Sequence, residues 1–103
     1  MFFHPYFSKV SHFNMLQAWI AIQCFAYYVY DRPAVSDRTY DQNAKQLKRL
    51  IDKYPHIHKE SKYYKAFVDF DPSTGFDLLE KIKKYYPHRY LFLMSQASML
   101  VNR

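Results

Sequence analysis

The sequence predicts an all-α protein, and three observations support this fold class. Only one of the 103 residues is glycine, which argues against glycine-rich phosphate-binding loops and against all-β folds with tight turns. Charged residues make up 23% of the chain and aromatic residues 20%, a composition unlike that of a disordered protein. Apolar residues recur at three- and four-residue steps, as in amphipathic helices. We expect one domain, 1–103, built as a small bundle of four to five helices.

The first helix is predicted from about Ser11 to Tyr30. One apolar row along it contains Phe13, Leu16, Ile20, Cys24 and Tyr27, and a second contains Met15, Ala18, Ile22, Phe25 and Val29. A helix that is apolar on two faces lies in the centre of a bundle or shares one face with a partner chain. In so short a chain few other helices are available to cover both faces, so we expect self-association.

The second helix follows a turn at Asp31–Val35. Ser36 occupies the position of an N-cap and Asp37 the favourable first turn, and the helix should run to about Tyr54, where Pro55 marks its end. Its predicted core row is Tyr40, Ala44, Leu47, Ile51 and Tyr54, with Lys45, Lys48, Arg49 and Lys53 facing water. We therefore expect the first two helices to form a hairpin.

The remainder of the chain predicts three shorter elements. Ser61–Phe70 is ambiguous between strand and helix, and we assign a short helix because no hairpin partner or turn signal lies nearby. Ser73 or Thr74 would cap the next helix, and Pro87 ends that helix or opens the last one, His88–Val101. The predicted core rows are Phe76, Leu79, Ile82 and Tyr86, then Tyr90, Leu93, Met94, Ala97 and Val101, widened by Leu91 and Phe92.

A cluster of ligand-competent side chains lies around the first turn and the start of the second helix. Its members are Tyr27, Tyr28, Asp31, Asp37, Tyr40 and Asp41. Asp37 and Asp41 are one helical turn apart, with Tyr40 beside Asp41. Carboxylates and tyrosine rings suit a planar ligand that is cationic or donates hydrogen bonds. The alternative is that the tyrosines belong to the core and the aspartates are helix caps.

The string A-Y-Y-V-Y-D-R-P-A-V-S-D-R-T-Y-D, residues 26–41, resembles the N-terminal Ia domain of NAD-dependent DNA ligases. That family carries a Tyr followed by His or Tyr, a Pro five residues on, and then S/P-D-x-x-Y-D. The resemblance implies a ligase Ia-like helical hairpin over 26–55, which in the family clamps the nicotinamide mononucleotide (NMN) half of NAD against an adenylation domain. It places the cofactor contacts on Tyr27, Tyr28, Asp37, Tyr40 and Asp41. Residues 76–103 carry no family resemblance.

The nucleotidyltransferase motif of these ligases, K-x-D-G, does not occur in the sequence. The single glycine, Gly75, follows Ser73 and Thr74, and no zinc module, helix-hairpin-helix or BRCT segment is recognisable. We therefore expect no ligase or adenylyltransferase activity from this chain alone. The resemblance implies a non-catalytic module that binds NMN or NAD, acting with a separate adenylation chain. An alternative is a phage or mobile-element protein that binds and inhibits a host defence protein.

A third hypothesis is nucleic-acid binding, because the chain has a net charge of +6. Basic residues gather in Lys45–Lys53, Lys59–Lys65 and Lys81–Arg89. The last two segments are interleaved with Tyr63, Tyr64, Tyr85 and Tyr86, whose rings could stack on exposed bases. The alternative is that these segments are solvated helix faces with the tyrosines half in the core.

Metal, membrane and disulfide chemistry are not indicated. His56 and His58 could share a strand face, but no further ligands complete a metal site, and we expect surface histidines. Cys24 is the only cysteine, so no intramolecular disulfide can form and a reducing compartment fits. The apolar segment Ala18–Tyr30 is too short to span a bilayer, and Met1–Phe7 does not look like a signal peptide. We expect a cytoplasmic protein.

Overall fold

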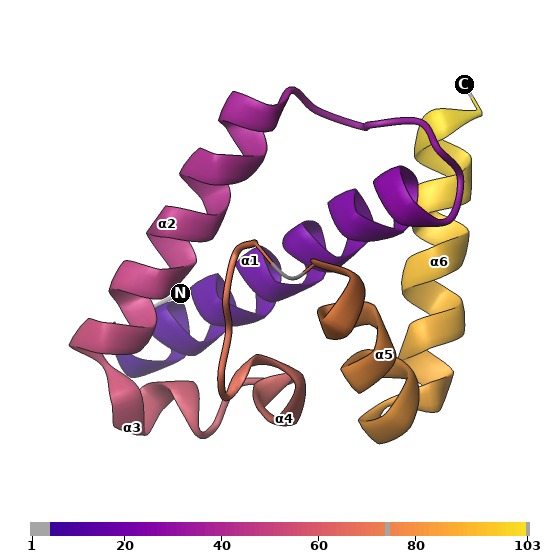
Figure 1. The fold of residues 1–103 in the computed structure, drawn as a ribbon. Helices are drawn as coiled ribbons and strands as arrows, with labels where there is room; N and C mark the ends of the chain where they lie inside the picture. Colours follow the sequence, from indigo (N-terminus) through magenta and orange to yellow (C-terminus); the bar gives the residue numbers. More distant parts are fainter. Residues whose placement is uncertain (1–4, 74, 103) are drawn as a thin grey trace.

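A computed structural model describes residues 5–73 and 75–102 and confirms the all-α class. Within these residues the chain forms no strand and six helices, four of them longer than two turns. Figure 1 shows their arrangement. The helices are α1 (Pro5–Tyr28), α2 (Asp37–Lys53), α3 (Pro55–His58), α4 (Tyr64–Phe67), α5 (Gly75–Tyr85) and α6 (Pro87–Val101).

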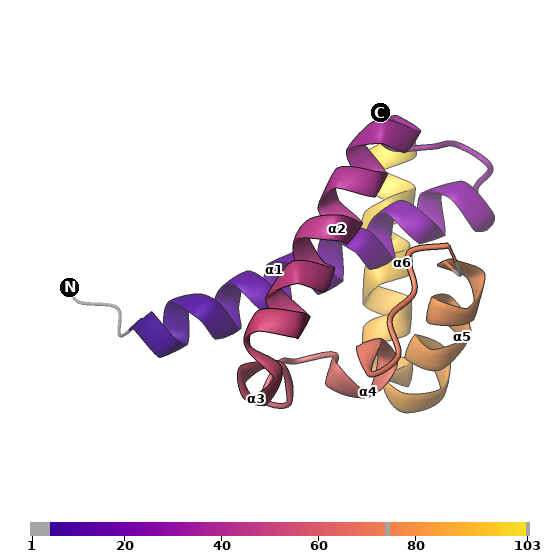
Figure 2. The same cartoon turned by 60° about the vertical axis from the view of Figure 1, so that its left-hand side comes forward.

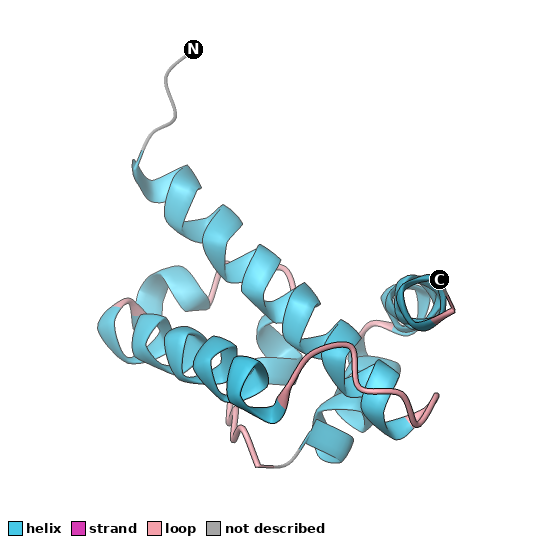
Figure 3. Ribbon diagram, turned by 90° about the horizontal axis from the view of Figure 1, so that it is seen from above, coloured by secondary structure: helices cyan, strands magenta, loops and turns pink. Residues whose placement is uncertain are grey.

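Helix α1 lies in the centre of the bundle and contacts α2, α3, α5 and α6. Figure 2 shows it running the length of the molecule, with α2 and α6 crossing it, and Figure 3 shows α6 almost end-on beside it. The side chains of Phe13, Ile20 and Phe25 are completely buried. The sequence left two explanations for the two apolar faces of this helix, a central place in the bundle or a face shared with a partner chain. The central place explains much of the observed burial.

Local signals set most helix boundaries. Ser36 caps α2 as predicted, since its hydroxyl oxygen accepts the Thr39 N–H at 3.1 Å. Pro87 is the first residue of α6, a position where the missing N–H costs no hydrogen bond. Helix α1 ends at Tyr28, two residues earlier than predicted, because Asp31 adopts a left-handed conformation with φ of 52°. The Arg32 N–H then donates a hydrogen bond to the Ala26 carbonyl at 2.9 Å, which closes the turn.

Helix α5 is rotated relative to its predicted core row. Phe76 is 56% exposed, whereas Leu78, Leu79 and Ile82 are buried. Gly75 sits against α1, so the buried face of α5 passes through residues 75, 78, 79 and 82, and Phe76 falls at its edge. The hydroxyl and N–H of Ser73 bond the Asp71 carboxylate, and Thr74, the other predicted cap, lies outside the described residues.

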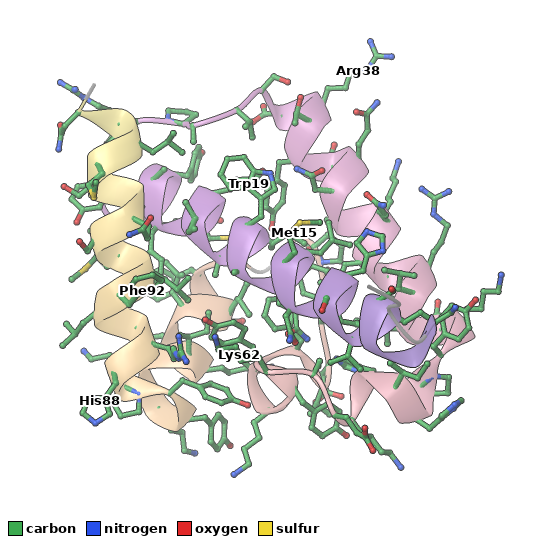
Figure 4. The ribbon with its side chains drawn as sticks, turned by 180° about the vertical axis from the view of Figure 1, so that it is seen from behind. Met15, Trp19, Arg38, Lys62, His88 and Phe92 are labelled. Atoms are coloured by element: carbon green, nitrogen blue, oxygen red, sulfur yellow. The ribbon has the colours of Figure 1, made fainter. Side chains whose placement is uncertain are left out.

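The back of the bundle carries exposed apolar side chains. Leu93 and Ala97 of α6 are buried as predicted, but Leu91 and Phe92 are exposed, so they do not widen the core row. Figure 4 shows Phe92 on the same open side as Met15 and Trp19 of α1. Self-association through this side stays a prediction. In the part of the chain that the structure describes, no helix has the length and apolar character needed to cross a membrane.

A buried amide ties α1 to the turn between α3 and α4. Gln17 is fully buried, its Nε2 donates to the Ser61 hydroxyl at 2.8 Å, and its Oε1 accepts the Tyr63 N–H at 3.1 Å. The Ser61 hydroxyl in turn donates to the His58 carbonyl. Near the surface, Asn14 Oδ1 accepts the Lys62 N–H at 2.7 Å. Two side chains of α1 thus hold three consecutive residues, 61–63, of the turn between α3 and α4.

We predict that Gln17→Leu strongly destabilises the fold. The substitution removes two buried hydrogen bonds and leaves the Tyr63 N–H without an acceptor, at a cost of about 2–4 kcal/mol. In a domain of this size that corresponds to a fall in Tm of roughly 10–25 °C. Thermal unfolding followed by circular dichroism measures it, with the exposed Gln42→Leu as the matched control. Equal Tm values for the two variants would contradict the anchoring role.

Candidate functional site

A pocket of about 180 Å³ lies between the end of α1, the start of α2 and the loop before α5. Figure 1 shows these three segments. The residues that line the pocket are Gln23, Cys24, Tyr27, Tyr28, Pro33, Ala34, Val35, Asp37, Tyr40 and Pro72. Four of the five cofactor contacts implied by the resemblance are therefore brought together: Tyr27, Tyr28, Asp37 and Tyr40. The fifth, Asp41, does not line the pocket.

Helical spacing explains which side chains reach the pocket. On α1, Gln23 and Tyr27 are four residues apart, as are Cys24 and Tyr28, so both pairs lie on one face of its last turns. On α2, each residue turns the helix by about 100°. Around the axis of α2, Tyr40 and Asp41 are about 100° apart, and Asp37 lies between them. Asp41 is exposed. The pocket uses the Tyr40 side of Asp37, so Asp41 does not line it.

The hydroxyl of Tyr40 closes the inner end of the pocket. It donates to the Pro72 carbonyl at 3.1 Å and lies 3.6 Å from the Cys24 Sγ. Since a carbonyl can only accept, the thiol is the donor to the hydroxyl oxygen. Burial, followed by the neighbouring Cys24, raises the pKa of Tyr40 far above its usual range. Tyr40 and Cys24 are therefore neutral groups whose protons are already engaged.

The outer wall of the pocket consists of two half-exposed tyrosine rings. Tyr27 is 52% exposed and Tyr28 45% exposed, and their rings meet edge to face with centroids 4.9 Å apart. The Phe76 ring packs edge to face against the Tyr28 ring, with centroids 6.0 Å apart. A Cβ at Gly75 would come within 2.9 Å of Tyr28 Cε2 and 3.0 Å of Cys24 Sγ. The single glycine thus lets α5 approach closely enough to hold this wall.

Gln23 also lines the pocket, although it was not among the predicted contacts. It is 3% exposed, and its Nε2 donates to the Trp19 carbonyl at 3.2 Å, while its Oε1 has no hydrogen-bond partner. Its spacing of four residues before Tyr27 is a signal that could have found it. Pro72 has no such signal, because 32 residues separate it from Tyr40.

His58 is not the surface histidine that the sequence predicted. It lies on the short helix α3, not on a strand, is 3% exposed, and stacks on Phe13 with ring centroids 5.5 Å apart. Burial, assisted by the charge of Lys48, lowers its pKa. Among residues 5–73 and 75–102, no group of three or more His, Cys, Asp or Glu side chains could hold a metal ion.

The basic segments offer fewer free aromatic rings than the sequence suggests. Tyr63 is buried, and the Tyr86 hydroxyl accepts the Lys65 N–H at 3.0 Å. Tyr64 packs against His58. Tyr85 stays exposed, with the Lys84 Nζ 5.2 Å from its ring centroid. The shallow groove beside it also contains acidic side chains, Asp69 and Glu80, which fit an ordinary solvated surface.

We predict that the Cys24 thiol is unreactive in the folded protein. Burial raises its pKa to about 11, partly offset by the hydrogen bond with Tyr40, against about 8.5 for a free thiol. The thiolate fraction at pH 8 is then roughly 250-fold smaller than in the unfolded chain. Reaction with a disulfide reagent at pH 8, with and without denaturant, measures the ratio. Equal rates in the two conditions would contradict this burial.

A comparison with known protein families matches the first part of the chain. A family model described as "DNA ligase-like, N-terminal NAD+-binding domain" matches residues 8–62. The match covers α1 from residue 8, all of α2 and α3, and the residues that follow as far as Lys62, and so extends beyond the predicted core 26–55 on both sides. No curated protein and no solved structure matches the chain. Because the family model covers more than half of its residues, the chain belongs to the DNA ligase-like, N-terminal NAD+-binding domain family.

Proposed function

We propose that this chain is a non-catalytic module that binds the nicotinamide-nucleotide half of NAD in the pocket between α1 and α2. The observation that carries the proposal is the polarity of the pocket. The Asp37 carboxylate lines it beside the half-exposed rings of Tyr27 and Tyr28, while the Tyr40 hydroxyl donates its proton to the Pro72 carbonyl. Such a pocket favours a flat ligand that is positively charged and donates hydrogen bonds.

The oxidised nicotinamide ring has these properties. Its pyridinium carries a positive charge, which is attracted both by tyrosine ring faces and by a carboxylate. Tyr27 and Tyr28 supply the rings, and Asp37 supplies the carboxylate at the pocket. A volume of about 180 Å³ is below the roughly 300–1,000 Å³ of sites that enclose whole ligands of drug size. The pocket therefore takes the ring and leaves the rest of the dinucleotide outside.

A partly enclosed nucleotide suits a module that acts together with another protein. Transfer of AMP from NAD needs a nucleophilic lysine held in its own pocket, and these 103 residues contain no K-x-D-G motif. A separate adenylation chain would bind the exposed half of the nucleotide and supply that lysine. Binding by this chain alone is accordingly weak, in the millimolar range, because only one wall of the clamp is present.

We predict that Asp37→Asn weakens NMN binding about three- to five-fold, whereas Asp41→Asn leaves it unchanged. The two carboxylates are one turn apart on α2, but only Asp37 lines the pocket. Loss of one partly exposed charge next to a cation corresponds to about 0.5–1 kcal/mol. Calorimetric titration of the two variants and the wild type measures the difference. Equal losses in both variants would mean that the ligand lies over the outer face of α2.

We also predict that the chain forms no covalent adenylate with NAD. No lysine among the described residues lines the nicotinamide pocket, so no nucleophile is held beside the bound dinucleotide. Incubation with NAD and a divalent metal ion, followed by intact-mass spectrometry, is the direct measurement. An added mass of one AMP on any lysine would overturn the non-catalytic assignment.

A further inference from the structure

We propose that the outer face of α6 is an interface through which two copies of this chain pair, with their α6 helices antiparallel. The face consists of the exposed residues Leu91, Phe92, Ser95 and Met99, which we call the α6 stripe. No residue of α6 lines the nicotinamide pocket, so the two surfaces are separate. The pairing therefore holds or fails independently of the proposed function.

The α6 stripe lies on the side of the helix that faces away from the bundle. Its four members are the exposed residues of segment 90–101, and the buried residues of this segment lie on the opposite side of the helix. Three of the four side chains are large and apolar. Their exposed fractions are 60% for Leu91, 52% for Phe92 and 66% for Met99. Water therefore meets a continuous apolar strip along α6.

This strip also contains no charge. Segment 90–101 has no Asp, Glu, Lys or Arg, although charged residues make up 23% of the chain. Helix α2 shows what a solvated face looks like in this protein, because its exposed side carries Lys45, Lys48, Arg49 and Asp52. Interface cores are depleted of charged residues and enriched in methionine and aromatic residues, as the α6 stripe is. Two copies with a net charge of +6 can meet here without burying a charged side chain.

The apolar face is large enough for a homodimer. Helix α1 packs against α6, and Figure 4 shows its residues Met15 and Trp19 on the same open side as Phe92. Met15 is 63% exposed. At about 200 Å² for each large side chain, Met15 and the three large residues of the stripe expose roughly 500 Å². A standard interface takes about 800 Å² from each partner, and about 65% of a homodimer interface is apolar. The exposed apolar area therefore matches what one copy must contribute.

The α6 stripe is complementary to itself. Its small residue, Ser95, lies midway along the stripe, four residues from both Leu91 and Met99. A two-fold axis beside Ser95 lets the two backbones approach closely there and packs Leu91 of each copy on Met99 of the other. Antiparallel pairing also sets opposite ends of the two helix dipoles side by side, whereas parallel pairing would set like ends together. A second copy thus covers the stripe with matching side chains.

A lipid surface fits this face less well than a second copy does. Helices that lie on membranes combine an apolar face with Lys and Arg on their polar face, which hold them to anionic headgroups. Segment 90–101 of α6 contains neither residue. The basic residues of the chain concentrate instead on α2 and on the segments 59–65 and 81–89.

The first test is analytical ultracentrifugation of the wild-type chain at tens to hundreds of micromolar, where we expect a reversible dimer. Met99→Glu places a charge without a partner against Leu91 of the other copy, so the dimer dissociation constant should rise at least ten-fold. Val68→Glu is the matched control, because Val68 is an exposed apolar residue at the end of α4, and it should change the constant less than two-fold. Circular dichroism checks that both variants are folded.

A cross-link tests the position of the two-fold axis. Ser95→Cys brings two thiols together at the axis, and oxidised glutathione should join them in an intermolecular disulfide, seen as a dimer on a non-reducing gel. Gln42→Cys, on the exposed side of α2, should stay monomeric under the same conditions. The native Cys24 is buried, so the wild type gives the background of the reaction.

Each contrary outcome overturns a stated part of the proposal. A wild type that stays monomeric at hundreds of micromolar would end it, whether or not NMN binds in the pocket. A dimer that folded Met99→Glu leaves intact would show that the copies pair through another face. Cross-linking of Ser95→Cys no faster than that of Gln42→Cys would contradict the axis beside Ser95. A monomer that sediments with neutral phosphatidylcholine vesicles would assign the face to a lipid surface instead.

Discussion

The position of α1 in the centre of the bundle is the constraint on which the rest of the structure depends. A helix of 24 residues that contacts α2, α3, α5 and α6 must present a different surface to each of them. Phe13, Ile20 and Phe25 fill the core, and Gln17 holds the turn before α4. The last two turns of the same helix then form one wall of the pocket. The geometry of the pocket therefore depends on the core, because the core side chains of α1 fix the direction in which Tyr27 and Tyr28 point.

The two buried glutamines of α1 lie in different surroundings, Gln17 at the turn before α4 and Gln23 at the pocket. Around Gln17 every amide atom is bonded, as expected where the chain maximises stability. Around Gln23 the protein leaves an acceptor unpaired and two tyrosine rings half exposed, both of which cost stability in the free protein. Departures from complete satisfaction are common at binding sites, because the ligand supplies the missing partners. The same helix thus explains both the rigidity of the site and its unsatisfied surface.

The parts of the structure that sequence could predict are those set by neighbours along the chain. The cap at Ser36 and the boundary at Pro87 follow from single residues, and the buried positions Ala44 and Leu47 follow from helical period. The grouping of Tyr27 and Tyr28 with Tyr40 needs only a hairpin of two helices. The Pro72 carbonyl and the close approach of Gly75 could not be predicted, because they depend on how α5 packs on α1. The exposure of Phe76 has the same cause.

The distribution of charge around the pocket bears on how a nucleotide would lie in the proposed complex. At physiological ionic strength charges interact over about 8 Å, so the groups nearest the pocket dominate. Asp37 lines the pocket, and the next residue, Arg38, projects away from the bundle (Figure 4). A pyridinium is drawn toward the carboxylate, and a phosphate is repelled by it. The chain's excess of basic residues, 15 against 9 acidic ones, favours the phosphates in the space outside. In the proposed complex these charges would place the ring inward and the phosphates outward, where a second protein could reach them.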